Sequence, residues 1–174
     1  AGNGSYWSLT GNTGTNPATH FIGTTDNMPL LLRVNNQPAG KIDQLLFNTS
    51  LGYHSLLSNT TGIYNTAHGA GSLYSNTTGT GNSTNGLQAL MMNVTGNYNT
   101  ANGTNALYSN RAGETATAVG AGAMYYSNNT LTPFVNTNVA VGFEALRGSA
   151  DASANTGNWN TATGYQSLWS NAAG

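Results

Sequence analysis

The stretch "NTAHGAGSLYSNTTGTG", residues 65–81, has close copies before and after it in the chain. The copies align on one internal glycine, which recurs at Gly52, Gly69, Gly86, Gly103, Gly120, Gly142 and Gly164. The first four steps between these glycines are 17 residues long and the last two are 22. A fixed period of this kind indicates a repeat architecture in which each unit stacks on the next. The repeat divides the chain into an N-terminal segment, 1–47, and seven units over 48–174, of which the last is partial.

Each unit keeps the same kinds of side chain at the same positions. Four residues after each glycine stands a large apolar residue, and just before that residue stands Ala or Ser; the column is Leu56, Leu73, Leu90, Leu107, Met124, Leu146 and Leu168. A second column of small residues lies two positions before the glycine. Like residues stack directly over one another in a solenoid, so these columns predict a thin interior of Leu, Ala, Ser and Thr.

The units are too short and too rich in Gly, Asn and Thr for pairs of helices. Seventeen residues suit one coil of a parallel β-solenoid, with two strands of about five residues joined by two turns. The N-T-T-G phrase, as in residues 76–79, predicts one turn, in which Asn bonds the local backbone and Gly takes positive φ. At the other bend, the invariant glycine predicts a position where a Cβ would clash.

The two longer units carry extra residues around 129–135 and 147–154. Insertions at one turn of a solenoid lie along one edge of the rod. That edge is the expected place for binding specificity, with Pro133, Phe134, Arg147 and Asp151 as candidate residues of the binding loops.

Charge is nearly absent, with Lys+Arg 4 and Asp+Glu 5. Four scattered cations do not form the basic stripe that nucleic-acid binding requires, so no such partner is expected. No apolar run reaches the roughly 18 to 20 residues of a membrane-spanning helix, so no membrane insertion is expected. There is no Cys, and disulfides therefore play no part in the fold.

A single narrow coil cannot cover all the apolar surface that the repeats carry. The residues left over are Leu51, Val119, Val141, Tyr64, Tyr98, Tyr74, Tyr108, Tyr125 and Trp159. Packing several chains side by side would cover this surface, so we expect a homo-oligomer with cyclic symmetry.

Units such as "NTANGTNALYSN", residues 99–110, and "NTATGYQSLWSN", residues 160–171, resemble the head repeats of trimeric autotransporter adhesins. They are also similar to repeats of bacterial surface proteins and phage tail fibres. The resemblance, which covers about residues 48–174, implies a left-handed parallel β-roll of three chains around one axis. It also implies an extracellular, cell-surface or virion location.

The N-terminal segment does not repeat, although it too resembles the region before such repeats in fibre proteins. Two strands, at 28–34 and 41–47, are expected to flank a polar turn at 35–40. This hairpin is expected to cap the open edge of the first coil. At the other end of the repeats, the open coil either continues into more chain or receives the N-terminal region of the next subunit, which would give a filament.

Few residues suggest chemistry. The histidines His20, His54 and His68 have no metal-binding spacing, and the acids Asp26, Asp43, Glu114, Glu144 and Asp151 do not pair closely. We therefore expect no enzyme activity, no metal and no cofactor. Sequons such as Asn59, Asn76 and Asn93 leave glycosylation open, and Tyr165, Trp159 and Trp169 suit stacking on sugars.

These observations favour an extracellular structural and adhesive fibre module whose partners are other copies of itself and a host surface or glycan. One alternative is an ice-binding solenoid, suggested by the ladder Thr49, Thr66, Ser83, Thr100 and Thr117, although the column two residues along lacks Thr. Another alternative is a glycan-binding domain of a phage tail fibre. A polysaccharide-cleaving enzyme is disfavoured because clustered carboxylates are missing.

Overall fold

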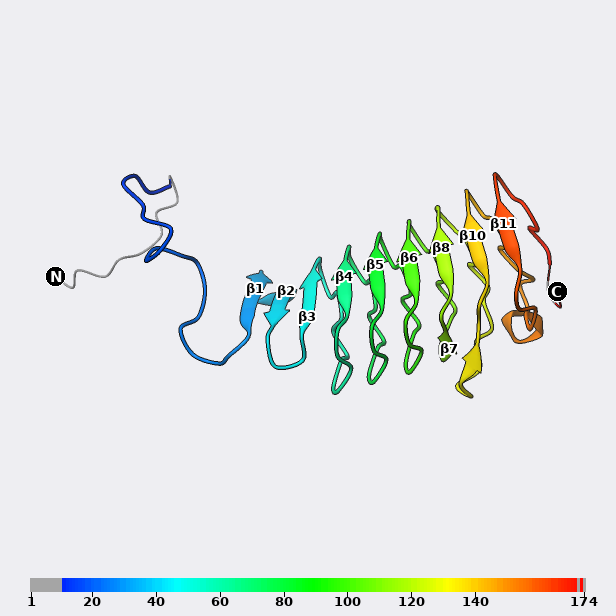
Figure 1. Cartoon of the computed structure of the whole chain (residues 1–174), viewed down its shortest axis with the longest axis horizontal. Coiled ribbons are helices and arrows are strands. Elements are labelled where there is room, and N and C mark those ends of the chain that lie inside the picture. Colours follow the sequence, from blue (N-terminus) through cyan, green and yellow to red (C-terminus); the bar gives the residue numbers. More distant parts are fainter. Residues whose placement is uncertain (1–10, 172, 174) are drawn as a thin grey trace.

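The computed structural model of the chain describes residues 11–171 and residue 173, and in them the protein is an all-β solenoid (Figure 1). The only helix among these residues is one turn of 3₁₀ helix, η1 (Ala152–Ala154). The strands are β1 (Leu30–Val34), β2 (Gln37–Asp43), β3 (Asn48–Leu51), β4 (Thr66–His68), β5 (Ser83–Asn85), β6 (Thr100–Asn102), β7 (Gly113–Glu114), β8 (Thr117–Val119), β9 (Phe134–Val135), β10 (Val139–Val141) and β11 (Thr161–Thr163).

Nine strands form one sheet in the order β1-β2-β3-β4-β5-β6-β8-β10-β11. From β3 onward the pairing is parallel, and residues at equivalent repeat positions lie opposite one another, as Ala67, Thr84 and Ala101 do. The solenoid has about five turns. The repeat read from the sequence is therefore the structural unit, and the prediction of a β-solenoid is confirmed.

The prediction of two strands per coil is wrong. Each coil has one main strand of three or four residues, and its opposite side is a series of turns; a second strand, of two residues, occurs only as β7 and β9 in two coils. On that side the N–H groups point in turn to the preceding and to the next coil, because Gly71 and Leu73 both have positive φ, of 67° and 50°. The N–H of Gly71 donates to the Tyr53 carbonyl in the preceding coil, at 2.9 Å, whereas the N–H of Leu73 donates to the Ala89 carbonyl in the next coil, at 3.1 Å. Hydrogen bonding thus continues between coils without an extended strand.

The apolar interior consists of the predicted column of large residues, the Ala or Ser directly before each of them, and the second column of small residues. Leu73, Leu90 and Leu107 have no exposed surface, and neither have Ala67, Ala101 and Ala118 in the small column. Covering coils are what bury them, since Leu146 is 7% exposed and Leu168, in the last coil, is 46% exposed. Each coil therefore depends on its neighbours for its core.

The interior also contains asparagine, which the sequence analysis had assigned only to turns. Asn65, Asn76, Asn82, Asn93 and Asn99 are almost completely buried. Within one coil, the Nδ2 groups of Asn65 and Asn76 both donate to the carbonyl of Gly79, at 2.9 and 3.0 Å. Two ladders of side-chain amides thus run through the solenoid, and their hydrogen bonds offset the cost of burying polar groups.

Two columns of glycine are needed for different reasons. A Cβ on Gly103 would lie 2.6 Å from the carbonyl carbon of Gly120, so the predicted clash at this column is confirmed. Gly79, in the N-T-T-G turn, was expected to have positive φ, and it does not. It is required because a Cβ there would lie 2.7 Å from Nδ2 of Asn93, inside the amide ladder.

The N-terminal hairpin has a shorter turn than expected. Strands β1 and β2 are joined by Asn35 and Asn36, whose φ values of 47° and 58° suit a tight hairpin turn. Pro38 lies in β2 rather than in the turn, next to the irregularity at Leu32 and Arg33 in β1. The predicted second strand at 41–47 is therefore wrong in its bounds, because the paired asparagines turn the chain earlier.

The hairpin adjoins the first coil through β2, which pairs antiparallel with β3. The carbonyls of Ala39 and Pro38 accept hydrogen bonds from the N–H groups of Gly52 and His54, at 2.9 and 3.1 Å. Within the solenoid the same N–H positions donate to a preceding coil. Residues 11–28 are exposed and lie beyond β1 in Figure 1. Residues 1–10 of the N-terminal segment lie outside the described residues.

Candidate functional site

The two inserts lie on successive coils, at the same lower edge of the solenoid in Figure 1. In the first insert, β9 pairs in parallel with β7 of the preceding coil. In the second insert, η1 is capped by Asp151, whose carboxylate accepts a hydrogen bond from the N–H of Ser153 at 3.1 Å. The inserts meet at a small cavity of about 30 Å³, lined by Phe134 from one and by Gly148 and Asn155 from the other.

The four candidate loop residues do not form a single site. Pro133 and Asp151 are exposed, whereas Phe134 and Arg147 are half-buried. Phe134 packs over Gly113, where a Cβ would lie 2.5 Å from the end of its ring. Part of the Phe134 ring is therefore used in packing between coils. Arg147 points toward aromatic side chains and belongs to a separate group.

That group, the Arg147 cluster, consists of Arg147, Glu144, Gln166, Trp169, Tyr125 and Tyr126. The guanidinium carbon of Arg147 lies 4.6, 5.3 and 5.7 Å from the ring centres of Tyr126, Trp169 and Tyr125. Its Nε is 3.1 Å from a carboxylate oxygen of Glu144. A cation that faces three rings and is paired with a carboxylate is held in one place.

Glu144 connects the cluster to the last coil. Its Oε2 accepts hydrogen bonds from Nε2 of Gln166, at 2.9 Å, and from the indole N–H of Trp169, at 3.0 Å. The hydrogen bond from Gln166, together with those from Trp169 and Arg147 and the charge of Arg147, lowers the pKa of Glu144, and this effect outweighs desolvation. Glu144 is thus an ionised acceptor that fixes the orientation of the indole.

The sequence predicts separate roles for Arg147, in a binding loop, and Trp169, in stacking on sugars, and does not connect the two residues. The contacts join residues 22 and 25 positions apart, a separation that matches no short motif. The repeat does contain the signal, because Arg147 and Trp169 occupy the same column, as do Glu144 and Gln166. Chemically, the cluster offers an exposed Trp169 and polar groups at fixed positions, which suit a ligand with a flat face and hydroxyl groups.

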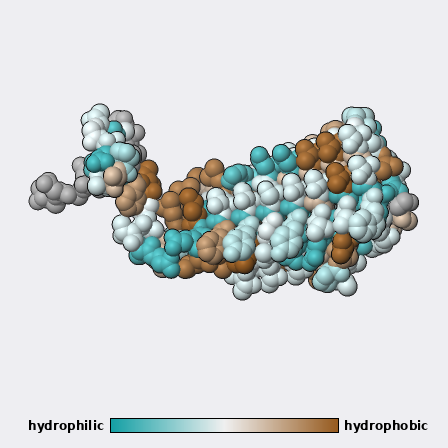
Figure 2. Space-filling model, viewed as in Figure 1, coloured by the Kyte–Doolittle hydropathy of each residue, from teal (hydrophilic) through white to brown (hydrophobic). Residues whose placement is uncertain are grey.

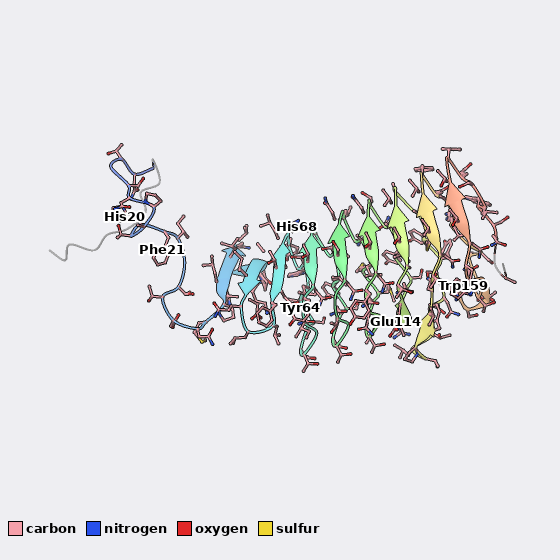
Figure 3. All side chains as sticks on the ribbon, in the orientation of Figure 1. His20, Phe21, Tyr64, His68, Glu114 and Trp159 are labelled. Carbon is pink, nitrogen blue, oxygen red and sulfur yellow. The ribbon has the colours of Figure 1, made fainter. Side chains whose placement is uncertain are left out.

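The histidines lie far apart in sequence and have different surroundings. His20 lies in the exposed N-terminal segment, where its Nδ1 accepts a hydrogen bond from the N–H of Asn16. His54 stacks on Tyr53 with ring centres 3.8 Å apart. His68 is exposed at the end of β4, near the upper edge of the coils in Figure 3, whereas Tyr64, Glu114 and Trp159 lie lower in that view. Among the described residues no group of three or more His, Cys, Asp or Glu is placed to hold a metal ion.

The buried asparagines bear on glycosylation. Asn76 and Asn93, which stand in sequons, have no exposed surface, and their amides donate within the ladder. A glycan on either side chain is incompatible with this fold. Asn102, in the sequon 102–104, is exposed on the outer face of β6.

The outer face of the sheet carries the threonine ladder. Thr49, Thr66, Ser83, Thr100 and Thr117 lie in one register across β3, β4, β5, β6 and β8. The neighbouring outer column is Leu51, His68, Asn85, Asn102 and Val119, so the face does not present two parallel rows of Thr.

No protein-family model, curated protein or solved structure matches this chain. In the residues that the structure describes, there is no helix with the length and apolar character that a membrane span requires.

Proposed function

We propose that the chain is an extracellular structural and adhesive module that builds a surface fibre, as an adhesin or as part of a tail fibre. The proposed module has seven coils, is capped by the β1–β2 hairpin, and assembles as a homotrimer in which coils pack side by side. Its adhesive function would depend on loops at the insert edge rather than on catalysis. The proposal adopts the β-roll geometry of the trimeric adhesins that the repeats resemble.

One observation carries the proposal, namely the apolar surface that the single chain leaves uncovered. Tyr64, Tyr98 and Leu51 are 58, 65 and 56% exposed, and Val141 and Trp159 are exposed as well. Side chains of this kind recur along the rod in two columns but not in every repeat, since Gly81 and Thr115 stand in the column of Tyr64 and Tyr98, and polar residues stand between Leu51 and Val141 in the other. Exposed apolar side chains at several levels of the rod favour association with parallel copies, which would bury them.

The test is the mass of the purified chain in dilute solution, together with electron microscopy. The proposal expects particles of three times the 17.9 kDa chain mass. Replacing Tyr98 by Ser should lower the trimer fraction, whereas replacing the exposed Thr78, in a turn, by Ser should leave it unchanged. A stable monomer at all concentrations would contradict the proposal.

Glycan binding is a second candidate, and the Arg147 cluster is the observation that favours it. Trp169 is 44% exposed and is oriented by its hydrogen bond to Glu144. Because the charge of Arg147 is neutralised by Glu144, the cluster favours a neutral sugar over an acidic one. In a panel of glycans, Trp169→Ala should abolish binding and Trp159→Ala should not. Ice binding by the threonine face would instead appear as thermal hysteresis.

A further inference from the structure

The nine-stranded sheet ends in two free edges, at β1 and at β11. Strand β1 pairs only with β2, and β11 pairs only with β10. A free edge presents unpaired N–H and C=O groups that are able to add another strand. These two edges lie at opposite ends of the solenoid (Figure 1).

The two edge strands run in the same direction. Strand β3 is parallel to β11 through the stacked coils, β2 is antiparallel to β3, and β1 is antiparallel to β2. Two reversals restore the direction, so β1 is parallel to β11, as their arrows in Figure 1 show. A second molecule shifted along the solenoid axis, with the same orientation, therefore brings its β1 to β11 in the parallel sense that the rest of the sheet uses.

At the C-terminal end of the described solenoid, a residue of the core column is uncovered. Leu168 is 46% exposed although its counterparts in earlier coils are buried. In earlier coils the N–H of Thr66 donates to the carbonyl of Asn82 in the following coil. The equivalent N–H of Thr161 has no following coil in the described part of the chain. Within the described residues, this end therefore has no apolar cover over Leu168 and no strand that pairs with the outer edge of β11.

The N-terminal end offers both an apolar surface and an unpaired strand edge. Strand β1 has the sequence LLLRV, and Leu31, Leu32 and Val34 are 53, 42 and 65% exposed. Beside the hairpin is a hollow of about 170 Å³ whose lining includes Leu31, Leu32, Leu56 and Leu57. Hydrophobic residues therefore gather at both ends, which Figure 2 shows as brown surface near the hairpin and near the last coils.

We propose that β11 of one molecule adds in parallel to β1 of a second copy, so that the sheet continues from molecule to molecule. The proposed contact continues the register of the existing sheet. Ala162 is linked through the column of Ala67 and Ser50 to Lys41, and Lys41 lies opposite Leu31. Continuing the column places Ala162 opposite Leu31, with Thr161 opposite Leu30 and Thr163 opposite Leu32.

This contact joins the β11 edge of one molecule to the β1 edge of another. Each pair of molecules keeps one free β1 edge and one free β11 edge, so the contact propagates into an open filament. A second copy of the chain is the occupant because the edges agree in direction and because one contact covers both apolar ends. The contact concerns the ends of the rod and does not depend on the side-by-side trimer proposed above.

A disulfide tests the contact directly, because the chain has no Cys. Leu30→Cys in one preparation and Thr161→Cys in another, of which one carries a size tag, are mixed and oxidised. Residues opposite each other in neighbouring strands are close enough for a disulfide. We expect a cross-linked heterodimer that forms at least tenfold faster than with Thr66→Cys, in the internal strand β4, in place of Thr161→Cys. Equal rates would overturn the proposal.

Electron microscopy of the full chain gives the second readout. We expect filaments whose assembly requires at least tenfold more protein in Leu31→Lys, since lysine on an edge strand opposes pairing. The matched control is Leu131→Lys, at an apolar side chain of similar exposure in the first insert, and it should assemble normally. Circular dichroism confirms that both variants are folded. Monomers or discrete trimers without filaments or end-to-end cross-links would overturn this contact, and trimers would still leave the side-by-side assembly supported.

Discussion

Asn65 and Asn82 occupy equivalent positions in successive coils, and one oxygen joins them. Oδ1 of Asn65 accepts hydrogen bonds from the backbone N–H of Asn82, at 3.0 Å, and from its side-chain Nδ2, at 3.1 Å. In the same way, Oδ1 of Asn82 accepts a hydrogen bond from the backbone N–H of Asn99 at 3.0 Å. The ladder thus bonds each coil to the next at a point where no water reaches, which makes the amides structural.

Replacing Asn82 by Leu keeps a similar volume and removes these bonds. The N–H of Asn99 would lose its acceptor, and the carbonyl of Gly96 would lose one of its two side-chain donors. We expect the free energy of unfolding to fall by about 2–4 kcal/mol, the cost of unsatisfied buried groups. Urea denaturation followed by circular dichroism measures the change.

The matched control for that substitution is Asn85→Leu, at the exposed end of strand β5, which begins directly after Asn82. It should change stability by no more than about 0.5 kcal/mol. Equal losses for both variants would show that the buried ladder is not a main source of stability.

The period, the glycine column and the apolar columns could be predicted from the sequence because each keeps its side-chain type in every repeat. The conformation of the leucines could not. Leu73, Leu90 and Leu107 have φ values of 50–53°, which sterics disfavour for residues with a Cβ. That conformation is maintained by hydrogen bonds to residues 16 positions or more away, such as that from Leu90 to Ala106, which local propensities do not contain. For the same reason the sequence did not show that the leucine side of each coil is a series of turns rather than a five-residue strand.

The asparagine ladders were missed for a different reason. Asn is usually exposed or in turns, so the N-T-T-G phrase predicts a turn role for Asn76, and the recurrence of Asn65, Asn82 and Asn99 gives no sign of a buried ladder. The interpretation was partly right, since Asn76 also bonds Gly79 three residues on in the same turn. The Arg147 cluster was missed because its members come from adjacent coils and become neighbours only after the columns are aligned.

Phe134→Ala should lower stability, since the ring lies half-buried over Gly113 and lines the cavity between the inserts. We expect a loss of about 1–2 kcal/mol, less than the 3–5 kcal/mol typical of a fully buried Phe. The initial expectation that this residue acts only in binding predicts no loss. Thermal unfolding compared with Leu131→Ala, an exposed residue of the same insert, separates the two interpretations.

Asp43 predicts a pH dependence for the hairpin. Desolvation alone would raise its pKa, but the ion pair with Lys41 at 2.8 Å and the N–H groups of Leu46 and Leu45 lower it below the ordinary value of 3.8. Because the folded state prefers the ionised form, Asp43 adds stability above about pH 4 that is lost as the pH falls through its lower folded pKa.

The measurement compares the melting temperature of the natural chain with that of Asp43→Asn between pH 7 and pH 2. We expect the variant to melt several degrees lower at pH 7 and the difference to shrink below pH 4. A difference that stays constant down to pH 2 would show that the charge of Asp43 is not what stabilises the hairpin.

Gly103 and Gly164 separate two reasons for the glycine column. Both have positive φ, 139° and 114°, so a Cβ strains the backbone at either position. Only Gly103 has a coil above it, where a Cβ would lie 2.6 Å from the carbonyl carbon of Gly120; around Gly164 nothing lies within 4 Å. We therefore expect Gly164→Ala to cost about 1–2 kcal/mol from strain, and Gly103→Ala to cost several kcal/mol more, because adjacent coils must move apart along the ladder. Urea denaturation of the two variants gives the difference. Equal costs would mean that the glycines are kept for backbone conformation alone and that the spacing of the coils tolerates a methyl group.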